Sequence, residues 1–288
     1  MNLWHRPLTA NELRQCLRIA FGCTLGFVLC KIFGWSNGVF FTVTPVLLLG
    51  MIPVMNGHAA RQLIASAAMC GLEVGLLGGL FGSHPGLMLP IVFLLFLYRF
   101  AAMSRGSLFL FGANGVLSLS IMLHFASYPE TDLNDLIFSN LWASVLSVLI
   151  AYLMTALIPD VEARPAPTPS PQAPPRMRHA ALLGASIATL SFLVFQLFDL
   201  RDSMSAQATT LLVLFPMHWD GALSYARKRA MGTLLGVSFG ILGQLVLYDW
   251  SGLLLLVTPL LWLGAMLFSH AHVKEASGSG VGFGALTT

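Results

Sequence analysis

The densest positive charge of the chain stands directly before its most glycine-rich apolar segment. Three consecutive cations lead into three glycines spaced four apart: Arg227, Lys228, Arg229, Gly232, Gly236 and Gly240. Glycines at this spacing line one helix face and let a second helix approach closely in lipid. Cations at a helix N-terminus add to its positive dipole end and would attract an anion. Two interpretations follow: close packing with topology-setting charge, or a funnel for anions.

The segment over 60–81 repeats this device. Arg61 precedes small residues at the same spacing, namely Ala67, Gly71, Gly75 and Gly79. The same two interpretations apply, and Arg61 is the predicted counterpart of Arg229.

Two apolar segments are interrupted by proline. The segment over 38–55 contains Pro45 and Pro53, and the short segment over 204–219 contains Pro216. Interrupted spans at corresponding places in two repeats indicate the substrate site of a transporter. The structural alternative is a kink that serves packing.

Glu73 is the one carboxylate placed deep inside an apolar segment. An ionised carboxylate at the bilayer centre costs about 2.5–3.5 kcal/mol. We predict a proton-coupling role for Glu73, on the helix face away from Gly71 and Gly75; a hydrogen-bonded packing residue is the alternative. His124, near the outer end of its segment, is predicted to serve in a proton relay or to be an interfacial histidine.

Other reactive residues favour no catalytic chemistry. Cys16, Cys23 and Cys30 fall seven apart on one helix face, which suits small packing residues better than a metal site. His270 and His272 are expected in a cytoplasmic loop, as a weak metal signal. The sequence contains no nucleophile–base arrangement and no nucleotide-binding loop of the GxGxxG type, so we expect no enzyme, metal or cofactor.

Composition identifies the class of protein. Of 288 residues, 56% are hydrophobic and 9% are charged, whereas a soluble domain carries roughly 25% charged residues. An all-α polytopic membrane protein is therefore predicted, and the absence of a basic patch with interleaved aromatics excludes a nucleic-acid partner. Helices are expected over 11–32, 38–55, 60–81, 86–103, 106–126, 135–158, 179–199, 204–219, 227–247, 252–270 and from about Gly278. Thr9 and Glu12 predict a capping box at the first helix.

The basic residues predict an orientation. With the N-terminus in the cytoplasm, all of the 15 Lys and Arg residues except Lys31 and Arg201 are assigned to the inner loops. Such an excess is the positive-inside signal of a multi-pass membrane protein. The linker is assigned to the same side.

The chain also repeats itself after about 168 residues, which superimposes Arg61 on Arg229 and Gly112 on Gly280. We predict two parallel-repeat six-helix bundles, over 1–158 and 179–288, with the second incomplete at the C-terminus. A proline-rich cytoplasmic linker over 159–178 joins them, and its composition suits a solvated, semi-rigid tether.

The segment YARKRAMGTLLG resembles a known signature. It is similar to the R-x-x-G-T-x-x-G motif of the fusaric acid resistance and aromatic acid exporter superfamily, with matches at Arg229, Gly232, Thr233 and Gly236. The first half keeps Arg61 but has other residues at the glycine and threonine positions. The resemblance implies two six-helix bundles, an organic anion as substrate, and a periplasmic membrane-fusion adaptor. The short linker resembles the compact branch, which lacks a large cytoplasmic domain.

The function expected from these features is efflux of organic carboxylates, with aromatic ones favoured. The proton gradient is the expected energy source because no nucleotide-binding signature is present. The expected partners are the lipid bilayer, the anion and the adaptor, and a homo-oligomer is left open. A passive organic-anion channel and a non-transporting scaffold for a periplasmic partner are the alternatives.

Overall fold

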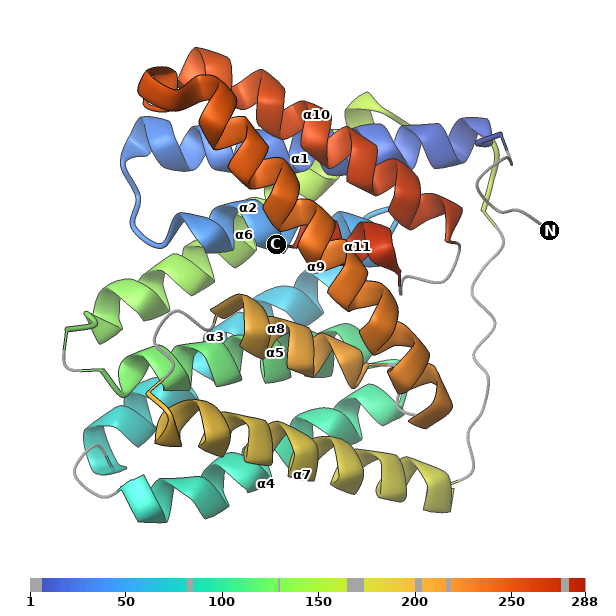
Figure 1. Ribbon diagram of the computed structural model, residues 1–288. Helices are drawn as coiled ribbons and strands as arrows, with labels where there is room; N and C mark the ends of the chain where they lie inside the picture. The colour runs from blue at the N-terminus through green and yellow to red at the C-terminus, as the bar shows by residue number, and fades with distance from the viewer. Residues whose placement is uncertain are drawn as a thin grey trace. The chain divides into compact units, whose positions relative to one another are not determined.

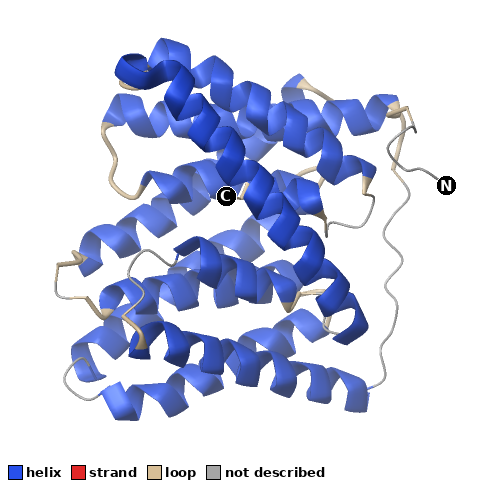
Figure 2. Cartoon of the chain, in the orientation of Figure 1, coloured by secondary structure: helices blue, strands red, loops and turns tan. Residues whose placement is uncertain are grey.

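A computed structural model describes residues 7–81, 85–128, 130–164, 174–199, 204–215, 219–275 and 280–287. These residues are helical and loop, with no strand among them (Figure 2). The helices are α1 (Ala10–Phe33), α2 (Gly38–Met51), α3 (Gly57–Phe81), α4 (Pro85–Ser104), α5 (Phe109–Ala126), α6 (Leu133–Leu157), α7 (Pro174–Leu197), α8 (Met204–Val213), α9 (Trp219–Leu247), α10 (Leu254–Lys274) and α11 (Val281–Leu286).

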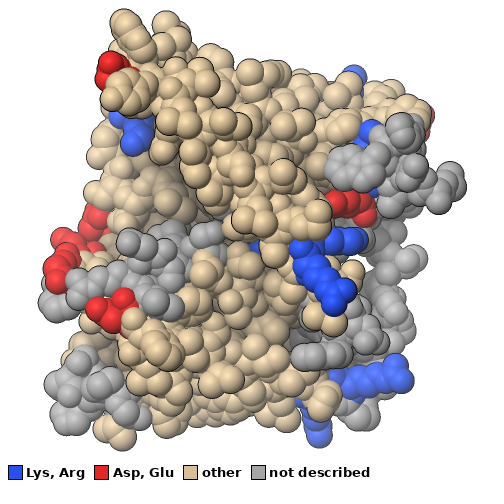
Figure 3. Space-filling view, in the orientation of Figure 1, with Lys and Arg blue, Asp and Glu red and all other residues tan. Residues whose placement is uncertain are grey.

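Eight of the described helices are long and apolar enough to cross a bilayer: α1, α3, α4, α5, α6, α7, α9 and α10. Broad parts of the visible surface carry neither acidic nor basic side chains (Figure 3). Large apolar residues such as Leu234, Leu242 and Leu245 of α9 are exposed, as lipid contact requires. The prediction of an all-α polytopic membrane protein is confirmed.

The helix ends follow local chemistry. The Thr9 hydroxyl accepts from the backbone of Glu12 and the Glu12 carboxylate accepts from Thr9, so the predicted capping box is confirmed. α2 ends at Met51, before Pro53, and not at residue 55. α7 begins at Pro174, inside the predicted linker, because prolines are tolerated in the first turn of a helix, where the N–H groups lack intrahelical partners.

Contacts divide the chain into two compact units. The first contains residues 1–57, 143–165 and 224–288. In it α1 packs against α2 and α10, α10 packs against α11, and α11 contacts α2. Figure 1 shows blue α1 running beside red α10.

The second unit contains residues 58–142 and 166–223. Here α7 packs against α8 and α4, α4 packs against α5, and α5 contacts α8 (Figure 1). Helices six positions apart in the chain, such as α1 and α7 or α4 and α10, occupy corresponding places in the two units. Each helix pair named for the first unit therefore has a corresponding pair that packs together in the second. This correspondence supports the internal repeat. Both units draw helices from both halves, and the division into successive bundles over 1–158 and 179–288 stays a prediction.

Proline in α2 serves helix packing. Pro45 is buried inside α2 and removes the N–H that would bond the Phe41 carbonyl. A Cβ built on Gly26 of α1 would lie 2.1 Å from this Phe41 oxygen and 3.3 Å from Pro45. Glycine therefore lets the α1 backbone approach α2 where proline has freed the carbonyl. This contact favours the packing interpretation of Pro45.

The start of the linker is fixed on α1, contrary to the prediction of a solvated tether throughout. The Asn11 side chain donates to the Glu162 carbonyl at 2.8 Å and accepts from the Val161 amide at 2.8 Å. Arg164 donates to the Asp160 carboxylate at 2.7 Å and to Gln15 at 3.0 Å. These contacts tie residues 160–164 to the first turns of α1.

Arg18 completes this latch from inside α1. It is almost fully buried and forms an ion pair with Asp160, so assigning it to an inner loop was wrong. Burial alone would raise the pKa of Asp160, but the hydrogen bonds and charges of Arg164 and Arg18 outweigh this effect and lower the pKa below its ordinary value.

Candidate functional site

Arg229 lies on α9 with 1% of its surface exposed. Its Nη2 donates a hydrogen bond to the Thr287 hydroxyl at 2.6 Å. Its Nε and Nη1 are buried without a hydrogen-bond partner in the described part of the chain, and none of the ion pairs found there involves Arg229. The guanidinium therefore keeps unused donors in an enclosed place.

Aromatic side chains surround this guanidinium. The Phe283 ring centroid lies 5.8 Å from Arg229 Cζ, and the Tyr225 phenol interacts with the same group. The buried His272 ring lies against Phe283, with centroids 5.0 Å apart. We call Tyr225, Arg229, His272, Phe283 and Thr287 the Arg229 cluster.

His272 adds a third polar atom without a partner among the described residues to the cluster. Its Nε2 lies 3.2 Å from the Gly50 carbonyl at the end of α2, so this nitrogen carries the hydrogen. Its Nδ1 is buried with no partner among the described residues. His272 belongs to α10, which extends to Lys274. The expectation of a cytoplasmic loop containing His270 and His272 was therefore wrong.

Glycines hold the cluster together. A Cβ on Gly232 would lie 2.1 Å from the Val281 carbonyl, and a Cβ on Gly284 would lie 2.9 Å from the Arg229 carbonyl. The α9 and α11 backbones can therefore touch beside Arg229. Gly240 belongs to the same predicted stripe, but a Cβ built on it would have no neighbouring atom of the described residues within 4 Å. Close helix approach thus occurs at Gly232 and not along the whole stripe.

The neighbouring cations are placed differently from Arg229. α9 begins at Trp219, well before Arg227, so the prediction that the cationic run opens this helix was wrong. Arg227 and Lys228 are exposed, whereas Arg229 is buried. Arg61, its predicted counterpart on α3, is exposed. The cationic run therefore does not lie at the N-terminus of α9, where it would form the predicted anion funnel. The buried guanidinium of Arg229 is the candidate anion-binding group instead.

Glu73 on α3 is held by an arginine of α4. Arg99 Nη2 lies 2.7 Å from Glu73 Oε2, and the two side chains are 0% and 11% exposed. Arg99 was assigned to an inner loop by the sequence, and the structure places it within α4. The glycines of α3 face another helix, since a Cβ on Gly71 would lie 2.9 Å from Ile137 of α6. The predicted separation of Glu73 from the glycine face is confirmed.

Arg99 makes few polar contacts besides Glu73. Its Cζ lies 4.6 Å from the Phe111 ring centroid and 5.7 Å from that of Tyr98, and Nη2 lies 3.8 Å from Cys70 Sγ. Gly115 of α5 makes room for this side chain, because a Cβ there would be 2.8 Å from Arg99 Cδ. Arg99 was not among the predicted site residues. It lies inside an apolar segment, and the preceding segment contains the lone carboxylate Glu73, which was a usable signal.

His124 is buried near the C-terminal end of α5. Its Nδ1 lies 3.1 Å from the Gln196 amide nitrogen of α7, and its Nε2 lies 3.4 Å from the Tyr128 hydroxyl. The ring is 0% exposed. Both nitrogens are used inside the second unit, in a contact that joins the ends of α5 and α7, and a relay role stays a prediction.

The remaining predicted positions lie outside the cluster or outside the described residues. Pro53 is half-buried in the turn after α2, and Thr233 and Gly236 are half-buried on α9. Pro216 lies outside the described residues. The four cysteines are free and buried, as packing residues would be.

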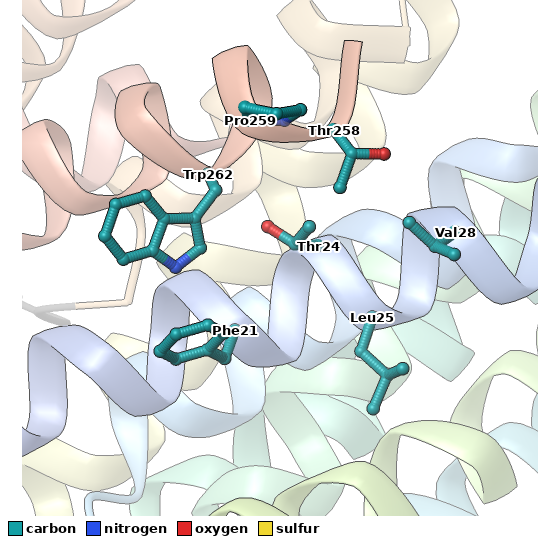
Figure 4. A pocket seen from close by; sticks show the side chains of 7 residues that line it. All are labelled: Phe21, Thr24, Leu25, Val28, Thr258, Pro259 and Trp262. Carbon is teal, nitrogen blue, oxygen red and sulfur yellow. The ribbon is translucent and has the colours of Figure 1, made fainter. Parts of the chain in front are cut away.

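An apolar pocket of about 520 Å³ lies between α1 and α10 of the first unit. Figure 4 shows Phe21 and Trp262 at one end and Val28 at the other, with Thr24, Leu25, Thr258 and Pro259 between them. The hydroxyls of Thr24 and Thr258 donate to the carbonyls of their own helices. No charged side chain lines this pocket, so it offers an anion no neutralising group.

Comparison with known proteins adds one match. Residues 15–154 match a family described as a protein of unknown function, DUF2955. No curated protein matches the chain. No solved structure matches it. The sequence and structure establish a multi-pass membrane protein whose described residues include three buried arginines, Arg18, Arg99 and Arg229.

Proposed function

We propose that the protein transports organic carboxylates across a membrane and catalyses no reaction. The observation that carries the proposal is the buried guanidinium of Arg229, which keeps two donor atoms unused among the described residues. A buried charge without an ion-pair partner is costly, so binding an anion there would be favourable. A carboxylate suits the planar fork of an arginine, which can donate two parallel hydrogen bonds.

The surroundings of Arg229 favour a carboxylate that carries an aromatic ring. Phe283 lies beside the guanidinium and His272 lies against Phe283, and aromatic side chains bind other rings in offset or edge-to-face geometry. The resemblance at Arg229, Gly232, Thr233 and Gly236 to aromatic acid exporters supports the same substrate class.

The remaining parts of the proposal concern direction, energy and location. We propose export across a bacterial inner membrane, with the N-terminus and linker in the cytoplasm, as the distribution of basic residues favours. The proton gradient as energy source and a periplasmic membrane-fusion adaptor rest on the resemblance and on the absence of a nucleotide-binding motif. A homo-oligomer is compatible with this function.

A passive organic-anion channel is the second candidate. The ion pair between Glu73 and Arg99 favours it over an isolated proton carrier, because a paired carboxylate has a structural role. A channel would conduct equally with Glu73→Gln, whereas a coupled exporter would lose its proton dependence.

Flux measurements in proteoliposomes test the proposal. The purified chain should move labelled 4-hydroxybenzoate, and Arg229→Gln should abolish the movement at equal protein content. Arg227→Gln is the matched control, since Arg227 is exposed on the same helix. Absence of carboxylate flux with the natural chain, or equal loss in both variants, would refute the assignment and favour a non-transporting scaffold.

A further inference from the structure

We propose that Glu73 is a built-in carboxylate ligand of Arg99, which a substrate carboxylate replaces when Glu73 takes up a proton. The proposal rests on carboxylate transport and adds a second anion-binding residue to it. It also names Arg99 as the residue that Glu73 releases when Glu73 binds a proton.

The ion pair is incompletely satisfied, which makes replacement feasible. Glu73 reaches one guanidinium nitrogen of Arg99 through one oxygen, Oε2, at 2.7 Å. Its other oxygen, and Nε and Nη1 of Arg99, are buried with no hydrogen-bond partner in the described residues. A guanidinium binds a carboxylate best through two parallel bonds. A free carboxylate can adopt that geometry, whereas Glu73 is tethered to α3.

The surroundings of Arg99 suit an aromatic carboxylate. The Phe111 ring centroid lies 4.6 Å from Arg99 Cζ, and the Tyr98 ring centroid lies 5.7 Å from the same atom. Aromatic faces and a guanidinium plane together accommodate a ring that carries a carboxylate.

Charge balance links the replacement to a proton. In the observed state Arg99 and Glu73 cancel each other. When a proton binds Glu73, its carboxyl becomes neutral and the incoming carboxylate cancels Arg99 instead. Both states are neutral overall, so neither leaves a lone buried charge, which would be strongly destabilising. One proton is therefore bound with each carboxylate, and this linkage holds for either direction of transport.

Other ionisable groups on the adjoining helices must be considered in any pH experiment. Cys70 and Tyr98 contact Arg99 directly. The remaining ionisable groups of α3 and of the helices α4, α5, α6 and α7 around it are His58, Arg61, His124, Asp135, Tyr152, Arg176, Arg178 and His179.

Ligand-induced thermal stabilisation of the purified full chain tests the proposal. A ligand that binds the folded state raises its melting temperature by mass action. Benzoate should stabilise the natural chain more at pH 6 than at pH 8, with an affinity that changes by up to about tenfold per pH unit. Benzyl alcohol, which has the ring without the carboxylate, should have no such pH-dependent effect.

Variants assign the effect to Glu73. Glu73→Gln and Glu73→Ala should bind benzoate with equal affinity at both pH values, because no competing carboxylate remains. Two variants are used so that poor folding of one leaves the other informative. The same pH dependence in both variants as in the natural chain would overturn the proposal.

Measurements in an Arg229→Gln background separate this proposal from the proposed function. The pH-dependent stabilisation by benzoate should persist there, since Arg99 is intact. If it disappears while the natural chain still binds benzoate, Arg99 is no anion site and carboxylate binding at Arg229 stands. If no form of the chain binds benzoate, carboxylate transport itself fails.

Discussion

Arg99 and Glu73 form an ion pair across α3 and α4, with 2.7 Å between Nη2 and Oε2 and almost no exposure of the arginine. Their pairing explains how a membrane-spanning segment tolerates the carboxylate that the sequence made conspicuous. Each charge is the other's main compensation.

Removing one partner should therefore be costly. Glu73→Ala should lower the free energy of unfolding by about 3–5 kcal/mol, because an uncompensated buried guanidinium remains. Adding Arg99→Met should recover most of the loss, since both charges are then absent. Thermal unfolding in detergent measures both effects. The exposed Glu162→Ala serves as control, and a double variant no more stable than Glu73→Ala would contradict the prediction.

The contact of α9 with α11 predicts a difference between two glycines of one helix. Gly232→Ala should destabilise the protein by about 1–3 kcal/mol, because the new methyl group would overlap the Val281 carbonyl. Gly240→Ala meets open space and should gain about 0.5–1 kcal/mol through helix propensity. Melting temperatures of the two variants decide the matter, and equal shifts would speak against the observed contact.

The latch at Asp160 should depend on pH. Its pKa is lower in the folded protein than in the unfolded chain because of Arg164 and Arg18. The stability it contributes is therefore complete above the ordinary pKa of about 4 and is lost as the pH falls through the lower folded value. Asp160→Asn should lower the melting temperature at pH 7 and have a smaller effect near pH 3, with Glu162→Gln as control. An equal effect at both pH values would contradict this account.

Orientation can be tested with two positions of the first unit. Ala163 follows α6 at the basic end, and Ser251 lies between α9 and α10; both are exposed. A membrane-impermeant thiol reagent added to intact cells should label Ser251→Cys and spare Ala163→Cys. The four native cysteines are buried and give a low background. Labelling of Ala163→Cys alone would reverse the predicted topology.

Much of the fold could be predicted from the sequence because hydropathy and proline mark spans directly. For the first ten helices, most of the ends were predicted to within a few residues, and the capping box at Thr9 was correct. The larger errors arose where polar residues continue a helix. α9 begins at Trp219, before the cationic run, and α10 continues through His272, whose side chain is buried.

The candidate site was harder to predict because burial of a charge depends on partners distant in sequence. Arg229 was chosen for its motif, but its enclosure by Phe283 and Thr287 needs the α9–α11 contact. Arg61 has the same motif position and is exposed. Arg99 was counted as a loop charge, since nothing local shows that Glu73 lies beside it.

The central claim is that Arg229 binds a carboxylate. Equilibrium binding of labelled benzoate to the purified chain at pH 8, where Glu73 occupies Arg99, tests it most directly. A charged hydrogen-bond pair contributes about 1.5–3 kcal/mol, so Arg229→Gln should weaken binding roughly 10- to 150-fold, whereas Arg227→Gln should leave it unchanged. Binding as tight in Arg229→Gln as in the natural chain would contradict the account.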